Sequence, residues 1–220
     1  MLARLVREVT TGGLAGSVLI TLRRALIGFT AATVIGLSVG IVVARVRLLR
    51  VAVGGLIAGL ETMPSIVWFP LAILAFGVSE TAISCVVILG AAPAIAQGVL
   101  FGVDQTPPLL VKAGRTLGAR GMALYRLVIL PAALPSIVAS LKLGWAFAWR
   151  GLMAGELIVA AAGASSVGSR LQLARQSQDA ELLVALMVAI CLIGVAVDAV
   201  FFGTADRAIR RRYGLVTPAG

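Results

Sequence analysis

The sequence contains no histidine, and only two of its 220 residues are cysteines. Without histidine the chain cannot form a Ser-His-Asp triad or a metal site that depends on imidazole ligands. Cys85 and Cys191 both lie inside apolar segments, where cysteine usually fills space as a small hydrophobic residue does. No other motif for a nucleophile is present. We therefore predict no catalytic residue, no metal site and no enzymatic activity of the chain itself.

Charge is also scarce, because 13% of the residues are charged whereas 60% are hydrophobic. Soluble domains carry about a quarter charged residues, and the mean hydropathy here is +1.06. The net charge of +10 comes from cations in short segments between apolar ones, which is typical of membrane topology. The sequence thus predicts an integral membrane protein that lies in a lipid bilayer and binds no nucleic acid.

The apolar segments predict an all-α, polytopic membrane protein, since every backbone polar group in lipid must be paired within the protein. Residues 1–24 read as an amphipathic surface segment, 25–205 as a transmembrane domain and 206–220 as a basic cytoplasmic tail. Pro64 and Pro70 predict a kink or break in the second span. Gly36 and Gly40 form a G-x-x-x-G pair that permits close helix packing. The predicted spans are 25–44, 54–77, 81–103, 131–158 and 182–203.

The cations are distributed unevenly between the two sides that five spans define. One side holds eleven: Arg45, Arg47, Arg50, Lys112, Arg115, Arg120, Arg126, Arg207, Arg210, Arg211 and Arg212. The other side holds six: Arg4, Arg7, Arg23, Arg24, Arg170 and Arg175. Since cytoplasmic loops carry an excess of Lys and Arg, we predict that the C-terminus and residues 104–130 are cytoplasmic and that the N-terminus is outside.

The segment 104–130 is the longest polar stretch between spans. Pro107 and Pro108 end the third span, and LLVKAGRTLG can form a short helix that closes at Gly118, because glycine tolerates the left-handed conformation at helix ends. Gly121 allows a second turn before ALYRLVILP returns to the bilayer. The alternative is an ordinary solvated loop, which is basic only because cytoplasmic loops are.

This segment resembles the cytoplasmic loop of the permeases of binding-protein-dependent ABC importers, which reads Glu-Ala-Ala, then Gly, and later an apolar-x-Leu-Pro ending. The matching positions here are Lys112, Ala113 and Gly114, then Gly118, and then Val128, Leu130 and Pro131. The stretches 60–77, 93–102 and 148–157 resemble the nitrate, sulfonate and taurine branch. The sequence departs from the pattern at Lys112, where the family has an acid, and at Gly114, where it has alanine.

The resemblance implies the five-helix core of a type I ABC importer permease, with a cytoplasmic coupling helix, in the cytoplasmic (inner) membrane of a prokaryote. Its partners would be an ATPase dimer, a second permease copy or a similar subunit, and an extracytoplasmic solute-binding protein. ATP and Mg would be held by the ATPase, because this chain lacks the phosphate-binding motif G-x-x-x-x-G-K-[ST]. The implied ATPase-coupling residues are Lys112, Ala113, Gly114, Arg115, Thr116, Leu117 and Gly118.

The fourth span carries candidates for the lining of a translocation path. At about 100° per residue, Lys142, Trp145, Trp149 and Glu156 share a sector of roughly 60°, and Arg150 lies about 80° from Lys142. Ionisable groups at membrane depth usually face a bundle interior or an aqueous cavity. One hypothesis is that this face lines the path and that Lys142 and Arg150 attract an anion. The alternative is that Lys142 reaches the interface and Arg150 pairs with Glu156 as a structural strut.

Glu61 is a further path candidate, being the only acid in the second span. It could instead pair with a neighbouring helix or hydrate near the interface. A rival function is an ion-coupled secondary carrier that uses Glu61, Lys142 and Glu156, but the sequence shows no inverted repeat. The favoured prediction is a permease for a small solute, anionic or organic, imported with ATP hydrolysis by a separate subunit.

Overall fold

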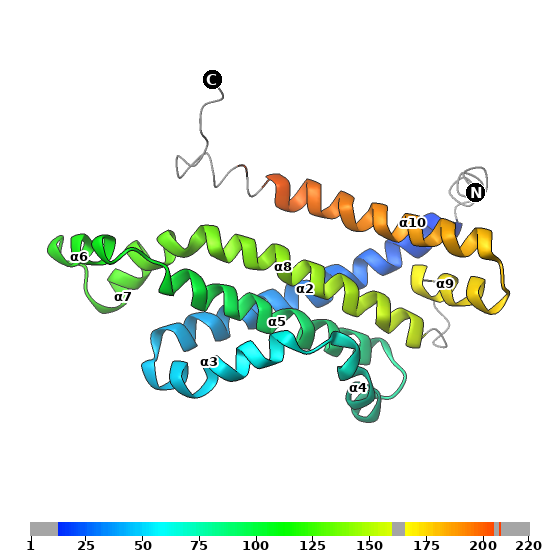
Figure 1. Ribbon diagram of the computed structural model, residues 1–220, viewed down its shortest axis with the longest axis horizontal. Helices are drawn as coiled ribbons and strands as arrows, with labels where there is room; N and C mark the ends of the chain where they lie inside the picture. Colours follow the sequence, from blue (N-terminus) through cyan, green and yellow to red (C-terminus); the bar gives the residue numbers. More distant parts are fainter. Residues whose placement is uncertain (1–12, 160–165, 205–206, 208–220) are drawn as a thin grey trace, which may run out of the picture.

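The computed structural model describes residues 13–159, 166–204 and 207, and throughout these ranges the chain forms helices and no strand (Figure 1). Three long helices form the centre of the molecule: α2 (Gly13–Arg45), α5 (Glu80–Asp104) and α8 (Leu130–Ile158). Helix α5 packs against both α2 and α8. The remaining elements are α3 (Arg47–Thr62), η1 (Ser65–Trp68), α4 (Phe69–Phe76), α6 (Pro108–Thr116), α7 (Gly121–Leu124), η2 (Tyr125–Ile129), α9 (Val167–Gln176), α10 (Ala180–Val197) and η3 (Asp198–Phe202).

Small residues allow the three central helices to approach one another closely. A Cβ atom placed on Gly36 would lie 2.7 Å from the Ala92 carbonyl oxygen of α5, and one on Gly40 would lie 2.8 Å from Val99 Cβ. On the other face of α5, a Cβ on Gly98 would lie 1.9 Å from Ser140 Cβ of α8. The predicted role of Gly36 and Gly40 in helix packing is therefore confirmed.

Four helical segments are long and apolar enough to cross a membrane: Leu14–Arg45, Glu80–Asp104, Gly121–Ile158 and Ala180–Phe202. They coincide with the predicted first, third, fourth and fifth spans apart from their ends. The main difference is at the first, where residues 13–24, which the sequence assigned to a surface segment, continue α2. The cations Arg23 and Arg24 interrupt the apolar run, but Arg24 is paired inside the protein and does not end the helix.

The second predicted span is broken rather than gently bent. Helix α3 ends at Thr62, and the following Ser65–Phe76 segment turns away from it by 103°. Pro64 lies at this break, as predicted. Pro70 does not kink a helix, because it lies in the first turn of α4, where its missing N–H group costs no helical hydrogen bond.

The helices give the molecule two distinct ends (Figure 1). Helices α6 and α7 lie at one end of the long axis, close to the α2–α3 junction, and α9 lies at the other. Helix α10 starts beside α9 and runs back along the bundle. Its described contacts are mainly with α9 and η3, so most of its surface is not covered by the rest of the chain.

Candidate functional sites

Helix α6 ends in a defined cap. The Ala119 N–H group donates to the Gly114 carbonyl (2.9 Å), and the Gly118 N–H group donates to the Arg115 carbonyl (3.0 Å). This pair of bonds is a Schellman motif, which requires a left-handed residue after the helix. Gly118 supplies it with a φ of +89°. The predicted helix end at Gly118 is confirmed, and the segment is a capped helix rather than an irregular loop.

The inner face of α6 packs against α7 and η2, the segment that returns to the bilayer. Gly114 is buried, and a Cβ atom there would lie 2.8 Å from Val128 Cγ2 and 3.0 Å from Leu124 Cδ1. Leu124 belongs to α7 and Val128 to η2, and η2 is tied to the end of α2 because the Tyr125 hydroxyl donates to the Ala44 carbonyl at 2.8 Å. Helix α6 thus packs on α7 and η2, which lead into α8 and are hydrogen-bonded to α2.

The outer face of α6 is exposed, basic and partly apolar. Lys112, Ala113, Arg115 and Thr116 are all exposed, and Leu117 is 88% exposed. None of the cations of this segment forms an ion pair with a described residue; these cations are Lys112, Arg115, Arg120 and Arg126. The sequence contains no acidic residue between Asp104 and Glu156, so no acid near these cations in the sequence can pair with them. Its surface is therefore available to another molecule.

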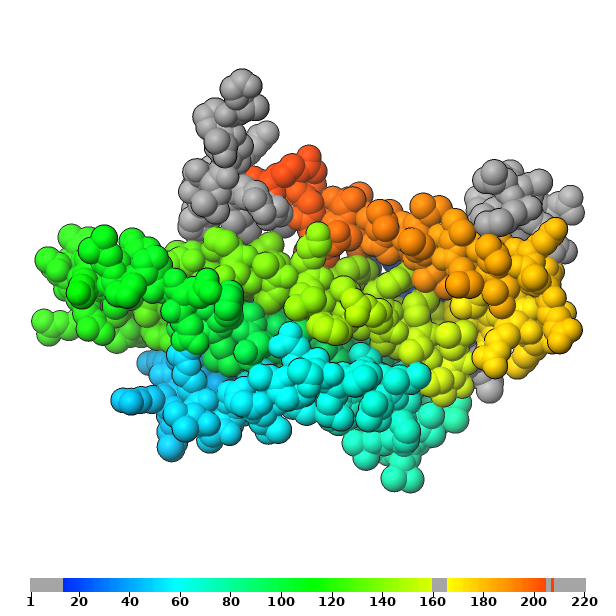
Figure 2. All heavy atoms as spheres, viewed as in Figure 1, coloured from blue at the N-terminus to red at the C-terminus, as the bar shows by residue number. Residues whose placement is uncertain are grey.

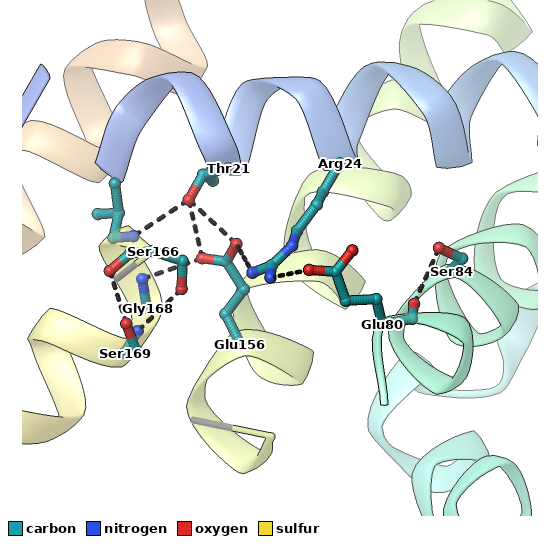
Figure 3. Close-up of polar contacts among 9 residues, drawn as sticks. Thr21, Arg24, Glu80, Ser84, Glu156, Ser166, Gly168 and Ser169 are labelled. Carbon is teal, nitrogen blue, oxygen red and sulfur yellow. Dashed lines mark hydrogen bonds and ion pairs between the residues drawn. The ribbon is translucent and has the colours of Figure 1, made fainter. Parts of the chain in front are cut away.

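At the opposite end, Glu156 is the centre of a buried polar network (Figure 3). Its side chain is inaccessible to solvent, and Thr21 Oγ1 lies 3.0 Å from both carboxylate oxygens. The carboxylate also accepts from Arg24 Nη1 (3.2 Å) and from the Gly168 N–H group (3.0 Å). Since these donors lie on α2 and at the start of α9, one side chain of α8 holds three helices together.

Arg24 extends this network to a fourth helix. Its Nη2 atom lies 2.5 Å from Glu80 Oε1 at the start of α5, so one guanidinium serves two carboxylates. The predicted Arg150–Glu156 strut is wrong, because the partner of Glu156 is Arg24. Six residues separate Arg150 from Glu156, which places them about 120° apart around α8.

The remaining path candidates on α8 are also engaged within the subunit. Trp145 is buried against Phe29 of α2 (ring centroids 5.3 Å apart) and stacks on Trp149. Lys142 Nζ lies 2.9 Å from Asp198 Oδ2 at the end of α10. The polar and aromatic face predicted for α8 therefore exists, but it packs on neighbouring helices and lines neither of the hollows described next.

Two hollows lie between α3 and α8; the first also borders α5, and the second borders η1. Figure 2 shows the atoms of the bundle, coloured along the sequence, with those of α3 and α8 on the visible face. One, of about 280 Å³, is lined mainly by apolar residues, together with polar residues that include Glu61, Gln97 and Ser136. The other, of about 270 Å³, is lined by residues that include Glu61, Ser65 and Arg150. Of the predicted path candidates, only Glu61 and Arg150 share a hollow. Gln97 was missed by sequence reasoning, although it is the only amide in the apolar sequence of α5.

The Arg150 side chain has a defined position beside this hollow. Its guanidinium carbon lies 5.4 Å from the centre of the Phe147 ring, one turn earlier on α8. A cation held over an aromatic face is attracted by the ring electrons. Arg150 is otherwise exposed, so its N–H groups are free to bind a group in the hollow.

Comparison with known proteins shows the family of the chain. Residues 32–213 match the family of binding-protein-dependent transport system inner membrane components. The chain belongs to this family. It is 30% identical over 198 residues to a probable ABC transporter permease protein of Brucella melitensis, covering 90% of this chain and 79% of that protein. It is 31% identical over 143 residues to the taurine transport system permease protein of Escherichia coli, covering 65% of this chain and 52% of that one.

Solved structures agree on the fold. A chain of the MetNI methionine ABC transporter in an inward-facing conformation superposes with a TM-score of 0.74 at 23% identity, covering 92% of this chain and 98% of that chain. The protein is therefore a multi-pass permease subunit of the inner membrane with the type I importer fold. Such a permease works with an ABC ATPase and a binding protein, and its family is not catalytic.

The rival function of a secondary carrier gains no support. Glu61 lines the hollows, Lys142 pairs with Asp198, and Glu156 is enclosed by Arg24 and Thr21. The three residues proposed for ion coupling therefore have separate surroundings. The family is that of an ABC importer permease, in which ATP hydrolysis supplies the energy.

Proposed function

We propose that this permease couples transport to ATP hydrolysis through α6, whose outer face docks on a separate ATPase. The observation that carries this proposal is the combination of a seated inner face and an unpaired basic outer face on one capped helix. Because Gly114 rests on Val128 of η2 and Leu124 of α7, a displacement of α6 would be passed to these two elements and through η2 to α8. The residues from Lys112 to Gly118 would form the contact.

The hollows that contain Glu61 and Arg150 would face the translocation path. They are open on one side, so a second subunit is needed to enclose a solute. Two copies of this chain would meet this requirement, with the binding protein delivering the solute at the outer end. ATP and Mg would be held by the ATPase, since this chain lacks a phosphate-binding loop.

The proposed orientation places α6 in the cytoplasm, the N-terminus outside and the C-terminus inside. Its support is that the cations at the α2–α3 junction, Arg45, Arg47 and Arg50, lie at the same end as α6, whereas Arg170 and Arg175 lie on α9 at the other (Figure 1). The basic tail 206–220 lies outside the described residues except for Arg207.

The proposed solute is small and carries an anionic group. Arg150 presents a planar, permanently charged fork that suits a carboxylate or sulfonate, and the hollow beside it has a volume of about 270 Å³. The Escherichia coli relative is named for the transport of taurine, which carries a sulfonate group. These two observations support a small organic anion or zwitterion.

The substitution Arg115→Pro tests the coupling role. Proline at this position removes a helical hydrogen bond and clashes with the preceding turn, at a cost of about 3 kcal/mol, so α6 should unfold. We expect solute-stimulated ATP hydrolysis of the permease–ATPase complex to fall to its unstimulated level. The control Arg115→Ala keeps the helix and should retain most of the stimulation. Full stimulation in a correctly inserted Arg115→Pro variant would refute the proposal.

A further inference from the structure

Two opposite charges line one hollow although they come from distant parts of the chain. Glu61 lies near the end of α3 and Arg150 lies on α8, and both line the same hollow together with the residues at the break after Thr62. Ser65 and Thr62 add hydroxyl groups to the lining, and Phe147 adds an aromatic face. The hollow therefore offers an anion, a cation and small polar groups within about 270 Å³.

Within the described residues, neither of these two charges has an ion-pair partner. Glu80, Asp104, Glu156 and Asp198 each form an ion pair with a cation. Glu61 forms no ion pair with any described residue, and neither does Arg150. The two side chains line the same hollow without meeting each other within ion-pair distance.

An ionisable group at membrane depth is costly unless it is paired or hydrated. Two such groups of opposite sign, left apart in one hollow, leave room between them for a ligand. A ligand with only a negative charge would be attracted by Arg150 but repelled by Glu61. A ligand with only a positive charge would be attracted by Glu61 but repelled by Arg150. A molecule with one group of each sign satisfies both side chains.

We propose that this hollow binds a small zwitterion, with its carboxylate or sulfonate on Arg150 and its ammonium group at Glu61. The inference rests on the proposed function, because it names the solute class of the path described there. The cation–π contact with Phe147 holds Arg150 in place, and the planar guanidinium suits a bidentate contact with the anionic group. The volume is close to the lower limit for ligand pockets, so the solute is small.

The test is a comparison of probes that differ by one charge. The permease–ATPase complex is placed in lipid nanodiscs without binding protein, and binding is measured by thermal stabilisation at increasing probe concentration. Taurine is compared with ethanesulfonate and ethylammonium, and β-alanine with propionate and ethylammonium. We expect at least one zwitterion to bind about tenfold more tightly than both of its singly charged counterparts, a difference of about 1.4 kcal/mol.

The variants assign the effect to the two residues. Glu61→Gln should abolish the preference, so that the zwitterion and the anion bind equally. Arg150→Gln should abolish the binding of both. Arg23→Gln removes an exposed cation of α2, which does not line the hollow, and serves as the matched control with unchanged binding.

Three results would overturn the inference. The first is that neither taurine nor β-alanine binds more tightly than its singly charged counterparts, and the second is a zwitterion preference that survives Glu61→Gln. The third is a loss of complex yield in both Glu61→Gln and Arg150→Gln that is restored by the double exchange Glu61→Arg with Arg150→Glu. The last result would indicate an ion pair between two copies. ATP hydrolysis stimulated by the loaded binding protein is measured on the same preparations. Stimulation that persists without a zwitterion preference rejects only this inference, whereas absent stimulation rejects the proposed function.

Discussion

At the scale of single residues, Glu156 links three helices through one buried carboxylate. Its carboxylate is fully buried and accepts from a hydroxyl, a guanidinium and a backbone N–H group on two other helices. A buried charge is tolerated when it is paired and hydrogen-bonded in this way, but removing one partner leaves the others without compensation. The network therefore stabilises the packing of α2, α8 and α9 at the end opposite α6.

We predict that Glu156→Ala lowers the stability of the subunit by about 3–5 kcal/mol, because Arg24 and Thr21 lose their buried acceptor. Glu156→Gln keeps an acceptor oxygen and should cost less. The matched control is Glu80→Gln, which removes the other carboxylate on Arg24; Glu80 is 65% exposed, and an exposed pair contributes about 1 kcal/mol or less. Thermal unfolding in detergent measures all three. Equal effects of Glu156→Ala and Glu80→Gln would contradict this role.

The sequence predicted Glu156 as a path residue or as the partner of Arg150, whereas its partner in the structure is Arg24. Helical periodicity states which residues of α8 share a face, whereas Arg24 lies on α2 and reaches Glu156 only through tertiary packing. By contrast, the conformation of Gly118 could be predicted, because a helix C-cap depends on local backbone geometry. Glu61 and Arg150 were both identified as candidates, but only the fold shows that they share a hollow.

At the scale of elements, the fit between α6 and the returning chain depends on one missing side chain. Gly114 is buried and allows α6 to approach Val128 and Leu124. This is one of the two positions at which the chain departs from the family pattern. The close approach of α6 to Val128 therefore depends on the absence of a side chain at Gly114.

We predict that Gly114→Ala displaces α6, because the added Cβ atom would lie 2.8 Å from Val128 Cγ2. Overpacking of this kind typically costs 1–3 kcal/mol, and stimulated ATP hydrolysis should fall. The double change Gly114→Ala with Val128→Ala should recover it by restoring space. Gly55→Ala is the control, since a Cβ atom on Gly55 of α3 meets nothing within 4 Å. If the double variant is as impaired as the single one, steric contact is not the cause.

The limits of most helices could be predicted, but their directions could not. Pro107 and Pro108 separate α5 from α6, and the side chain of Ser79 caps the start of α5. Pro64 indicates where α3 ends, yet the turn of 103° that follows is set by packing on α5 and α8. The short helix α9 was not predicted, because its sequence is polar and lacks an apolar periodicity.

At the scale of the whole molecule, the distribution of charge agrees with the arrangement of the helices. The class of protein followed from composition, since a chain this apolar must bury its backbone polar groups in helices. Because α6 and α9 lie at opposite ends of the molecule, the chain between them must cross the membrane an odd number of times. Helix α8 provides one crossing between them (Figure 1).

We therefore predict that α6 and α9 are accessible from opposite sides of the membrane. In a background with Cys85→Ala and Cys191→Ala, Leu117→Cys and Arg175→Cys each place one thiol at an exposed position. An impermeant maleimide should label Leu117→Cys only in inside-out vesicles and Arg175→Cys only in intact cells, because the basic end is retained in the cytoplasm. The reverse pattern would invert the proposed orientation. Labelling of both from one side would mean that α8 does not span the membrane.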